Sequence, residues 1–106
     1  MSVMRPVDVL VKAKELLNAP DGYRKRMLCD GHGGYCAIGA LMGAVQGTKM
    51  VHGWSSRDGV DLAAYRYLMR VNPNPVHTNN TTDLATVNKM FCAAIALVAE
   101  EETSDE

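Results

Sequence analysis

The chain has 106 residues, of which 47% are apolar and 22% charged, a balance typical of an ordinary globular domain. Its formal net charge of −1 conceals an asymmetry, because residues 100–106 hold five of the twelve acids and no base. The other residues carry seven acids and eleven bases, a formal charge of +4 that falls short of the dense basic clusters of a dedicated nucleic-acid-binding protein. No apolar run approaches the roughly 18 residues that would cross a membrane, and the first residues lack a secretory signal pattern.

Three cysteines are an odd number and their spacing is not that of a disulfide framework, so we expect reduced thiols and a cytoplasmic location. We expect one helical domain over residues 1–100. Residues 101–106 should form a frayed acidic tail, because like charges repel and the C-terminus of a helix disfavours acids.

A first helix is predicted to begin at Pro6, since proline suits the first helical position. Its apolar residues recur at helical spacing: Val9, Leu10, Ala13, Leu16 and Leu17. Pro20 and Gly22 should end it. Residues 23–34 lack helical periodicity, and the pair Asp30-Gly31 predicts a glycine-rich turn or a short β-ribbon.

A second helix is predicted from Tyr35 to Gln46, with Gly47 after its C-terminus. Its small residues leave one face nearly bare: Gly39, Ala40, Gly43 and Ala44. Glycine inside a helix costs about 1 kcal/mol relative to alanine, so we expect a close contact to compensate. We predict that this face packs against the C-terminal helix.

A third helix should begin after Ser55-Ser56 or near Val60, and its apolar stripe is Ala63, Ala64, Tyr67, Leu68 and Val71. Residues 72–75 (Asn-Pro-Asn-Pro) then predict a stiff connector.

The fourth helix is predicted to carry Asp83 in its first turn and to bury one side: Leu84, Val87, Phe91, Ala94, Ile95 and Val98. The polar residues before it are expected to cap it: Asn79, Asn80, Thr81 and Thr82. The sequence therefore predicts an all-α domain of four helices, with the second and fourth in contact at its centre.

The second helix also carries a recognisable motif, Tyr35-Cys36-Ala37-Ile38-Gly39-Ala40-Leu41 followed by Gly43. It resembles the Cys-Ala-x-Gly-Ala-Leu signature of a small domain family of unknown function from actinobacteria and their bacteriophages. The order of the later features is similar, with an Ala-x-x-x-Leu helix at residues 63–68 and an Ala-Ile pair at 94–95. Where the family has a Trp-Asn-Asp cap, this chain has His77 followed by Thr78-Asn79-Asn80. The resemblance implies a helical fold in a phage or bacterial cytosol, and no activity.

Cys29, His32 and Cys36 offer three soft ligands within eight residues, and His52, His77 or Cys92 could complete a zinc site. Cys36 could instead be a nucleophile, because a helix N-terminus favours a thiolate. The spacing matches no standard metal motif, and a small buried cysteine is the commoner case. We therefore expect neither a metal nor another cofactor, and we expect a binding protein rather than an enzyme.

A short apolar loop follows the second helix and offers a surface for a partner: Met50, Val51, His52 and Trp54. The preferred hypothesis is a phage-type or bacterial accessory protein that binds a host or phage protein, or a second copy of itself, through this loop. One alternative is a small thiol- or metal-dependent enzyme or binder that uses Cys36, Cys29 and His32. Another is a weak nucleic-acid-binding regulator that uses residues 24–26, although we do not expect nucleic acid or membrane as a partner.

Overall fold

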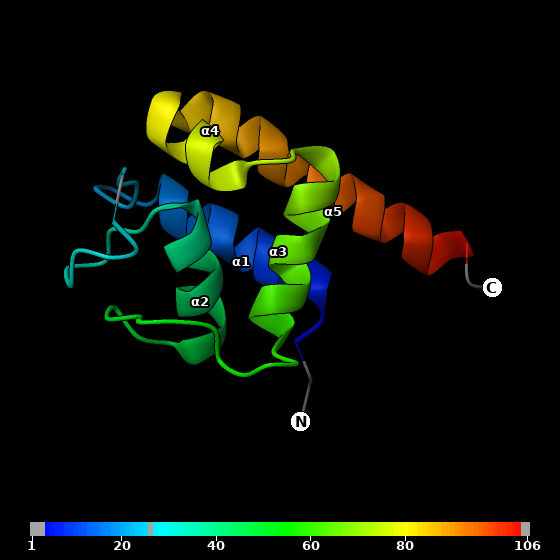
Figure 1. The fold of residues 1–106 in the computed structure, drawn as a ribbon, viewed down its shortest axis with the longest axis horizontal. Coiled ribbons are helices and arrows are strands. Elements are labelled where there is room, and N and C mark those ends of the chain that lie inside the picture. Colours follow the sequence, from blue (N-terminus) through cyan, green and yellow to red (C-terminus); the bar gives the residue numbers. More distant parts are fainter. Residues whose placement is uncertain (1–3, 26, 105–106) are drawn as a thin grey trace.

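The computed structural model describes residues 4–25 and 27–104, and five α-helices lie in this part of the chain (Figure 1). In chain order they are α1 (Pro6–Asn18), α2 (Ala37–Gln46), α3 (Val60–Val71), α4 (Pro75–Thr81) and α5 (Leu84–Ser104). The all-α class is confirmed. The predicted count of four was wrong, because α4 lies where a connector and a polar loop were expected.

Helix α4 forms because the second half of the Asn-Pro-Asn-Pro segment starts a helix after the first half has ended one. Pro75 is the first helical residue, and the Asn74 side chain accepts a hydrogen bond from the His77 backbone N–H at 3.1 Å. Asn72 closes α3 through its backbone N–H, which donates to the Leu68 carbonyl at 2.9 Å. The two helices therefore join with almost no intervening chain.

The segment from Tyr23 to Gly34 forms no strand in its described residues, so the predicted β-ribbon was wrong. It makes two isolated bridges instead, Tyr23 with Tyr35 and Cys29 with Tyr35. Gly31 and Gly33 take positive φ angles of 79° and 101°, which bend the return path away from a regular hairpin. The result is an irregular loop folded against the start of α2.

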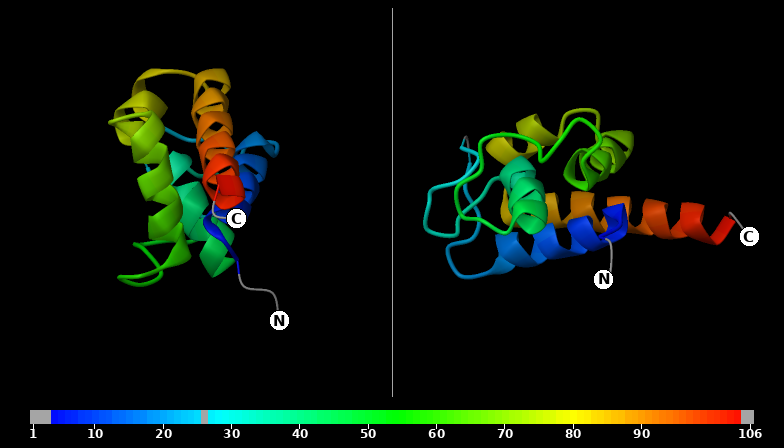
Figure 2. Two further views of the ribbon diagram at one scale, coloured as in Figure 1. Left: turned by 90° about the vertical axis from the view of Figure 1, so that its right-hand side faces the viewer. Right: turned by 90° about the horizontal axis from the view of Figure 1, so that it is seen from below.

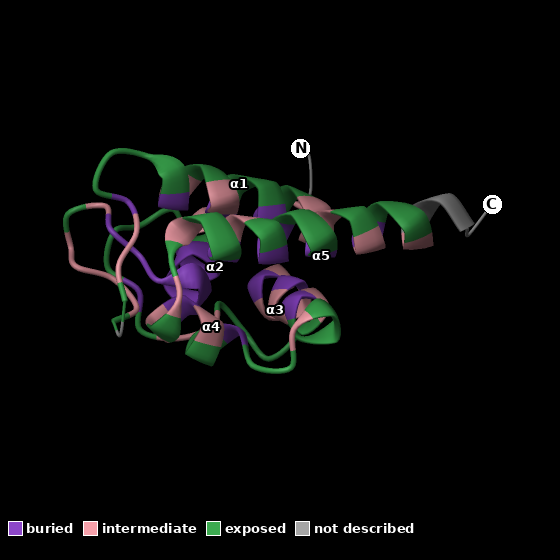
Figure 3. Ribbon diagram, turned by 90° about the horizontal axis from the view of Figure 1, so that it is seen from above, coloured by how far each residue is buried: buried purple, intermediate pink, exposed green. Residues whose placement is uncertain are grey.

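Helices α1 and α5 run side by side in opposite directions and form one layer, while α2 and α3 cross it on one side (Figure 2). Their inward sides make up the core (Figure 3). The stripes predicted for α1 and α5 are confirmed, with four buried residues from each: Val9, Leu10, Ala13 and Leu17, and Val87, Phe91, Ala94 and Val98. The core is completed mainly by Ala40 and Leu41 of α2 and by Ala64 and Leu68 of α3.

The predicted packing of α2 on the C-terminal helix was wrong. Helix α2 packs chiefly against α1, and also against α3 and α4. Its glycines make room for other groups: a Cβ on Gly39 would collide with the carbonyl oxygen of Leu28, and one on Gly43 would lie 2.8 Å from the ring of Tyr35. The two glycines of this face therefore make room for the preceding loop and an aromatic ring, while Ala40 lies in the core.

The structure moves several predicted helix ends. Helix α2 begins at Ala37 with Cys36 as its N-cap, and α3 begins at Val60, the later of the two predicted starts. Before α5, Asp83 accepts hydrogen bonds from the backbone N–H and the hydroxyl of Thr86 at 2.9 and 2.8 Å. Asp83 therefore caps α5. Of the residues predicted to do so, Asn79 accepts from the Ala37 N–H of α2, and the hydroxyls of Thr81 and Thr82 donate to carbonyls of α4.

The C-terminal end of α5 is held against α3. The Glu101 carboxylate accepts a hydrogen bond from the Tyr67 hydroxyl at 2.8 Å and pairs with Arg70. These bonds lower the pKa of Glu101. The helix continues to Ser104, into the segment predicted to be a tail, and residues 105–106 lie outside the described residues. No helix in the described residues is both long and apolar enough to cross a bilayer.

Candidate binding pocket

A pocket of about 350 Å³ opens between the loop before α2 and helix α4. Its walls are mainly apolar, with two amides on the α4 side: Met27, Leu28, Cys36, Ile38, Val76, Asn79 and Asn80. Met27 and Val76 are 46% and 43% exposed. The pocket thus presents apolar groups to solvent from two different elements.

The pocket's two walls are joined by Asn79, whose side chain is almost fully buried. Its amide oxygen accepts from the Ala37 backbone N–H at 2.9 Å, and its amide nitrogen donates to the Arg24 carbonyl at 3.2 Å. Its own carbonyl accepts from the Tyr23 hydroxyl at 2.6 Å. Asn79 is therefore a capping residue. It lies on α4 and caps the first turn of α2, not the C-terminal helix.

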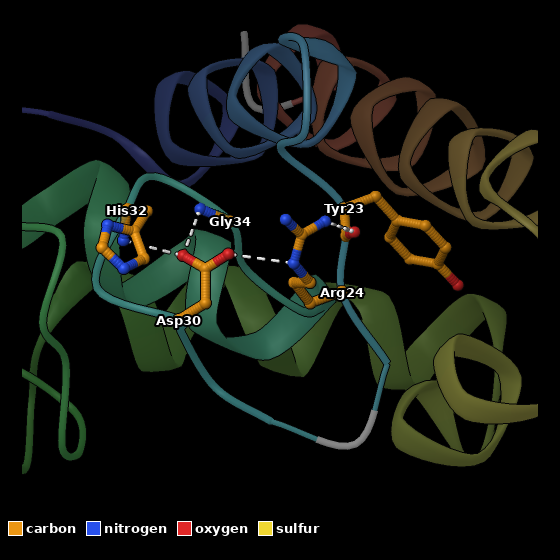
Figure 4. Close-up of polar contacts among 5 residues, drawn as sticks. All are labelled: Tyr23, Arg24, Asp30, His32 and Gly34. Atoms are coloured by element: carbon orange, nitrogen blue, oxygen red, sulfur yellow. Dashed lines mark hydrogen bonds and ion pairs between the residues drawn. The ribbon is translucent and has the colours of Figure 1, made fainter.

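The loop that forms the other wall is organised by Asp30 (Figure 4). One carboxylate oxygen accepts from the backbone N–H groups of His32 and Gly34 at 2.8 and 2.9 Å, and the other pairs with Arg24 Nε at 2.9 Å. The two backbone bonds, with help from Arg24, lower the pKa of Asp30. The loop therefore holds its shape above the ordinary pKa of a carboxyl group and loses this support as the pH falls.

Cys36 lines the pocket and acts as the N-cap of α2. Its Sγ accepts a hydrogen bond from the Gly39 backbone N–H at 3.3 Å. Burial raises the pKa of the thiol, against the smaller opposing effect of the backbone N–H groups. A nucleophilic cysteine needs the opposite shift, so this geometry favours a structural thiol.

Cys29 and His32 do not converge with Cys36 on a common point. The Cys29 sulfur lies between the backbone N–H and carbonyl of Val51, at 3.3 and 3.7 Å. Across residues 4–25 and 27–104, no three His, Cys, Asp or Glu side chains form a group that could hold a metal ion. Of the basic run at 24–26, Arg24 is paired with Asp30 and Arg26 lies outside the described residues.

The loop predicted to bind a partner splits into two sides. Met50 is 52% exposed and His52 is exposed, whereas Val51 is buried in a small cluster beneath the loops. Trp54 is half-buried, with its ring 5.2 Å from that of Tyr65. The loop thus presents Met50 and His52 to solvent and turns Val51 inward.

The comparison with known families matches residues 1–97 to DUF6197, a family of unknown function. The chain belongs to this family. The match agrees with the resemblance seen in the sequence to a family without an assigned activity. No curated protein and no solved structure matches this DUF6197 member, so its function has to be inferred from the geometry of its own residues.

Sequence reasoning missed the pocket in this DUF6197 domain and one buried acid. Asp61 is fully buried and accepts from the backbone N–H and the hydroxyl of Ser55, at 2.8 and 2.9 Å, and from the Leu62 N–H. Ser55 therefore lies before α3 and not at its start, and its bonds to Asp61 hold the loop that leads into the helix. The sequence did not point to Val76, because this residue directly follows the segment expected to be a connector and lies in a helix that was not predicted.

We expect the thiols of this DUF6197 domain to differ sharply in reactivity. Cys92 is exposed, whereas Cys36 is buried with a raised pKa, so alkylation at neutral pH should label Cys92 first and Cys36 at least about tenfold more slowly. Mass spectrometry of timed iodoacetamide reactions measures the order. In denaturant all three thiols should react alike, and faster labelling of Cys36 in the folded protein would support the nucleophile hypothesis.

Proposed function

We propose that this DUF6197 member acts by binding another protein, and that the pocket between the 27–38 segment and α4 receives an apolar side chain of the partner. The observation that carries the proposal is the exposure of Met27 and Val76 beside an apolar pocket of about 350 Å³. That volume lies within the range of small-ligand pockets and accommodates a large aliphatic or aromatic group. Methionine suits such a surface because its flexible side chain adapts to the bound group.

The fixed parts of the pocket support the same proposal. Asn79 bonds to the loop and to α2, and Asp30 shapes the loop, so the site exists before a partner arrives. A preformed site loses little conformational entropy on binding. We further propose, from the resemblance in sequence, that the partner is a host or phage protein in a bacterial cytoplasm, and that this chain is an accessory protein.

Val76→Asp tests the proposal, because the new carboxylate would have to be desolvated against an apolar partner group. The tagged variant should recover at least about tenfold less of the bound protein from a bacterial lysate than the tagged wild-type chain does. A loss of this size is expected for a central interface residue. Quantitative mass spectrometry of the captured proteins provides the measurement, and circular dichroism checks the fold.

Val71→Asp is the matched control, since Val71 is a similarly exposed valine at the end of α3, away from the pocket. Proteins lost with Val76→Asp and kept with Val71→Asp would be the specific partners. Equal capture by both variants would contradict the proposal that the pocket binds the partner. Met50→Asp is a third variant. If it alone loses the captured proteins, the binding surface is the loop after α2 and not the pocket.

A further inference from the structure

The outward side of α5 is apolar although it faces solvent. Residues 90–99 include no charged or hydrogen-bonding polar side chain over ten positions. Met90, Phe91, Ala94 and Val98 fill the core, but Cys92, Ala93 and Ala96 on the other side are exposed. A helix that is apolar on all sides is normally buried on all sides, so we expect another protein surface to pack against this face.

The exposed surface of α5 continues onto α1, where apolar and polar side chains are mixed. A groove of about 310 Å³ lies there, lined by Val11, Lys14, Glu15, Asn18 and Ile95. Val11 is 41% exposed. The two helices lie side by side as one layer, so whatever covers the outward side of α5 can also contact this groove (Figure 3). The exposed surface is therefore broader than a single line of alanines.

The charges at the two ends of this face indicate which surface packs against it. Lys89, Ala93, Ala96 and Glu100 are all exposed and follow one another at spacings of four, three and four residues, which places them along one line of the helix. No ion pair or hydrogen bond engages the side chain of Lys89 or Glu100 within residues 4–25 and 27–104. The pattern Lys-Ala-Ala-Glu is complementary to itself when read in the opposite direction.

We propose that two copies of this chain associate through α5 in antiparallel orientation, about a twofold axis between residues 94 and 95. Lys89 then faces Glu100 of the second copy, and Ala93 faces Ala96, so the same two contacts occur twice, as in any twofold interface. The alanines let the helices approach closely, and the charges fix direction and register. Glu101 already bonds to α3, which holds the last turns of α5 in place for the contact.

Charge exchange tests this arrangement by sedimentation equilibrium of the full chain. Lys89→Glu or Glu100→Lys alone would turn both attractive pairs into repulsive ones, and each should weaken the dimer by about tenfold. The double variant restores both pairs with their signs exchanged and should recover the wild-type dissociation constant. All these positions are exposed on a helix, and circular dichroism should show unchanged helicity.

Lys49→Glu is the control, because it makes the same change in charge on the loop after α2. It should leave the dimer unchanged. A wild-type chain that remains monomeric up to about 1 mM would overturn the proposal. So would a dimer weakened by Lys49→Glu but not by the α5 substitutions, or single variants that the double variant does not rescue. The α5 face shares no residue with the pocket, so these outcomes are independent of partner capture.

Discussion

Replacing Gly39 with alanine is expected to lower the free energy of unfolding by about 3 kcal/mol or more. The added methyl group would occupy the space of the Leu28 carbonyl, which is backbone and cannot rotate away as a side chain would. Moving it would also disturb the bond that Leu28 accepts from the Cys36 backbone N–H at 3.4 Å. The higher helix propensity of alanine, about 1 kcal/mol, is too small to offset this overlap. Denaturant unfolding followed by circular dichroism measures the change.

Two other glycines provide a graded comparison. Gly53 has open space where its Cβ would lie, so Gly53→Ala should stay within about 0.5 kcal/mol of wild type. Gly43→Ala should fall between, because it meets the edge of the Tyr35 ring, which is held by a hydrogen bond from its hydroxyl to the Thr48 carbonyl at 2.7 Å. An unchanged unfolding midpoint for Gly39→Ala would contradict the contact with the loop.

The long helices could be predicted from sequence because their burial has a period. In α1 and α5 the apolar residues recur every three or four positions, and those are the positions that the core covers. Helix α4 was not predicted because its seven residues span only about two turns, too few to show a period. Its initiating Asn-Pro pair also follows another Asn-Pro pair that ends α3, and the two together resemble a connector.

The site was harder to predict because its contacts join distant parts of the chain. Two glycines in α2 indicate that something approaches closely, but they do not indicate whether it is a helix, a loop or a ring. Cys36 was expected in the core and is buried, yet its capping role depends on where α2 begins. Asn79 belongs to a residue type that caps helices, and only the packing of α4 on α2 shows which helix it serves.

Asn79→Leu is expected to cost about 3 kcal/mol of folding stability, although leucine is close to asparagine in size. Leucine offers no acceptor to the Ala37 backbone N–H and no donor to the Arg24 carbonyl. Each buried polar group left without a partner costs about 1–3 kcal/mol. Both losses fall where the loop, α2 and α4 meet, so the pocket should loosen as well. Chemical denaturation gives the stability, and hydrogen exchange of the Ala37 amide reports the missing cap directly.

Asn88→Leu is the comparison that separates burial from the mere loss of hydrogen bonds. Asn88 and Asn18 exchange two side-chain bonds, at 2.8 and 3.0 Å, but on the exposed edge between α1 and α5. Water can replace those bonds, so this substitution should cost less than about 1 kcal/mol. If the two leucine variants prove equally stable, or if exchange at Ala37 is unchanged in Asn79→Leu, then Asn79 does not join the two walls of the pocket. A selective loss at Asn79 would show that α4, the helix not predicted from the sequence, organises the start of α2.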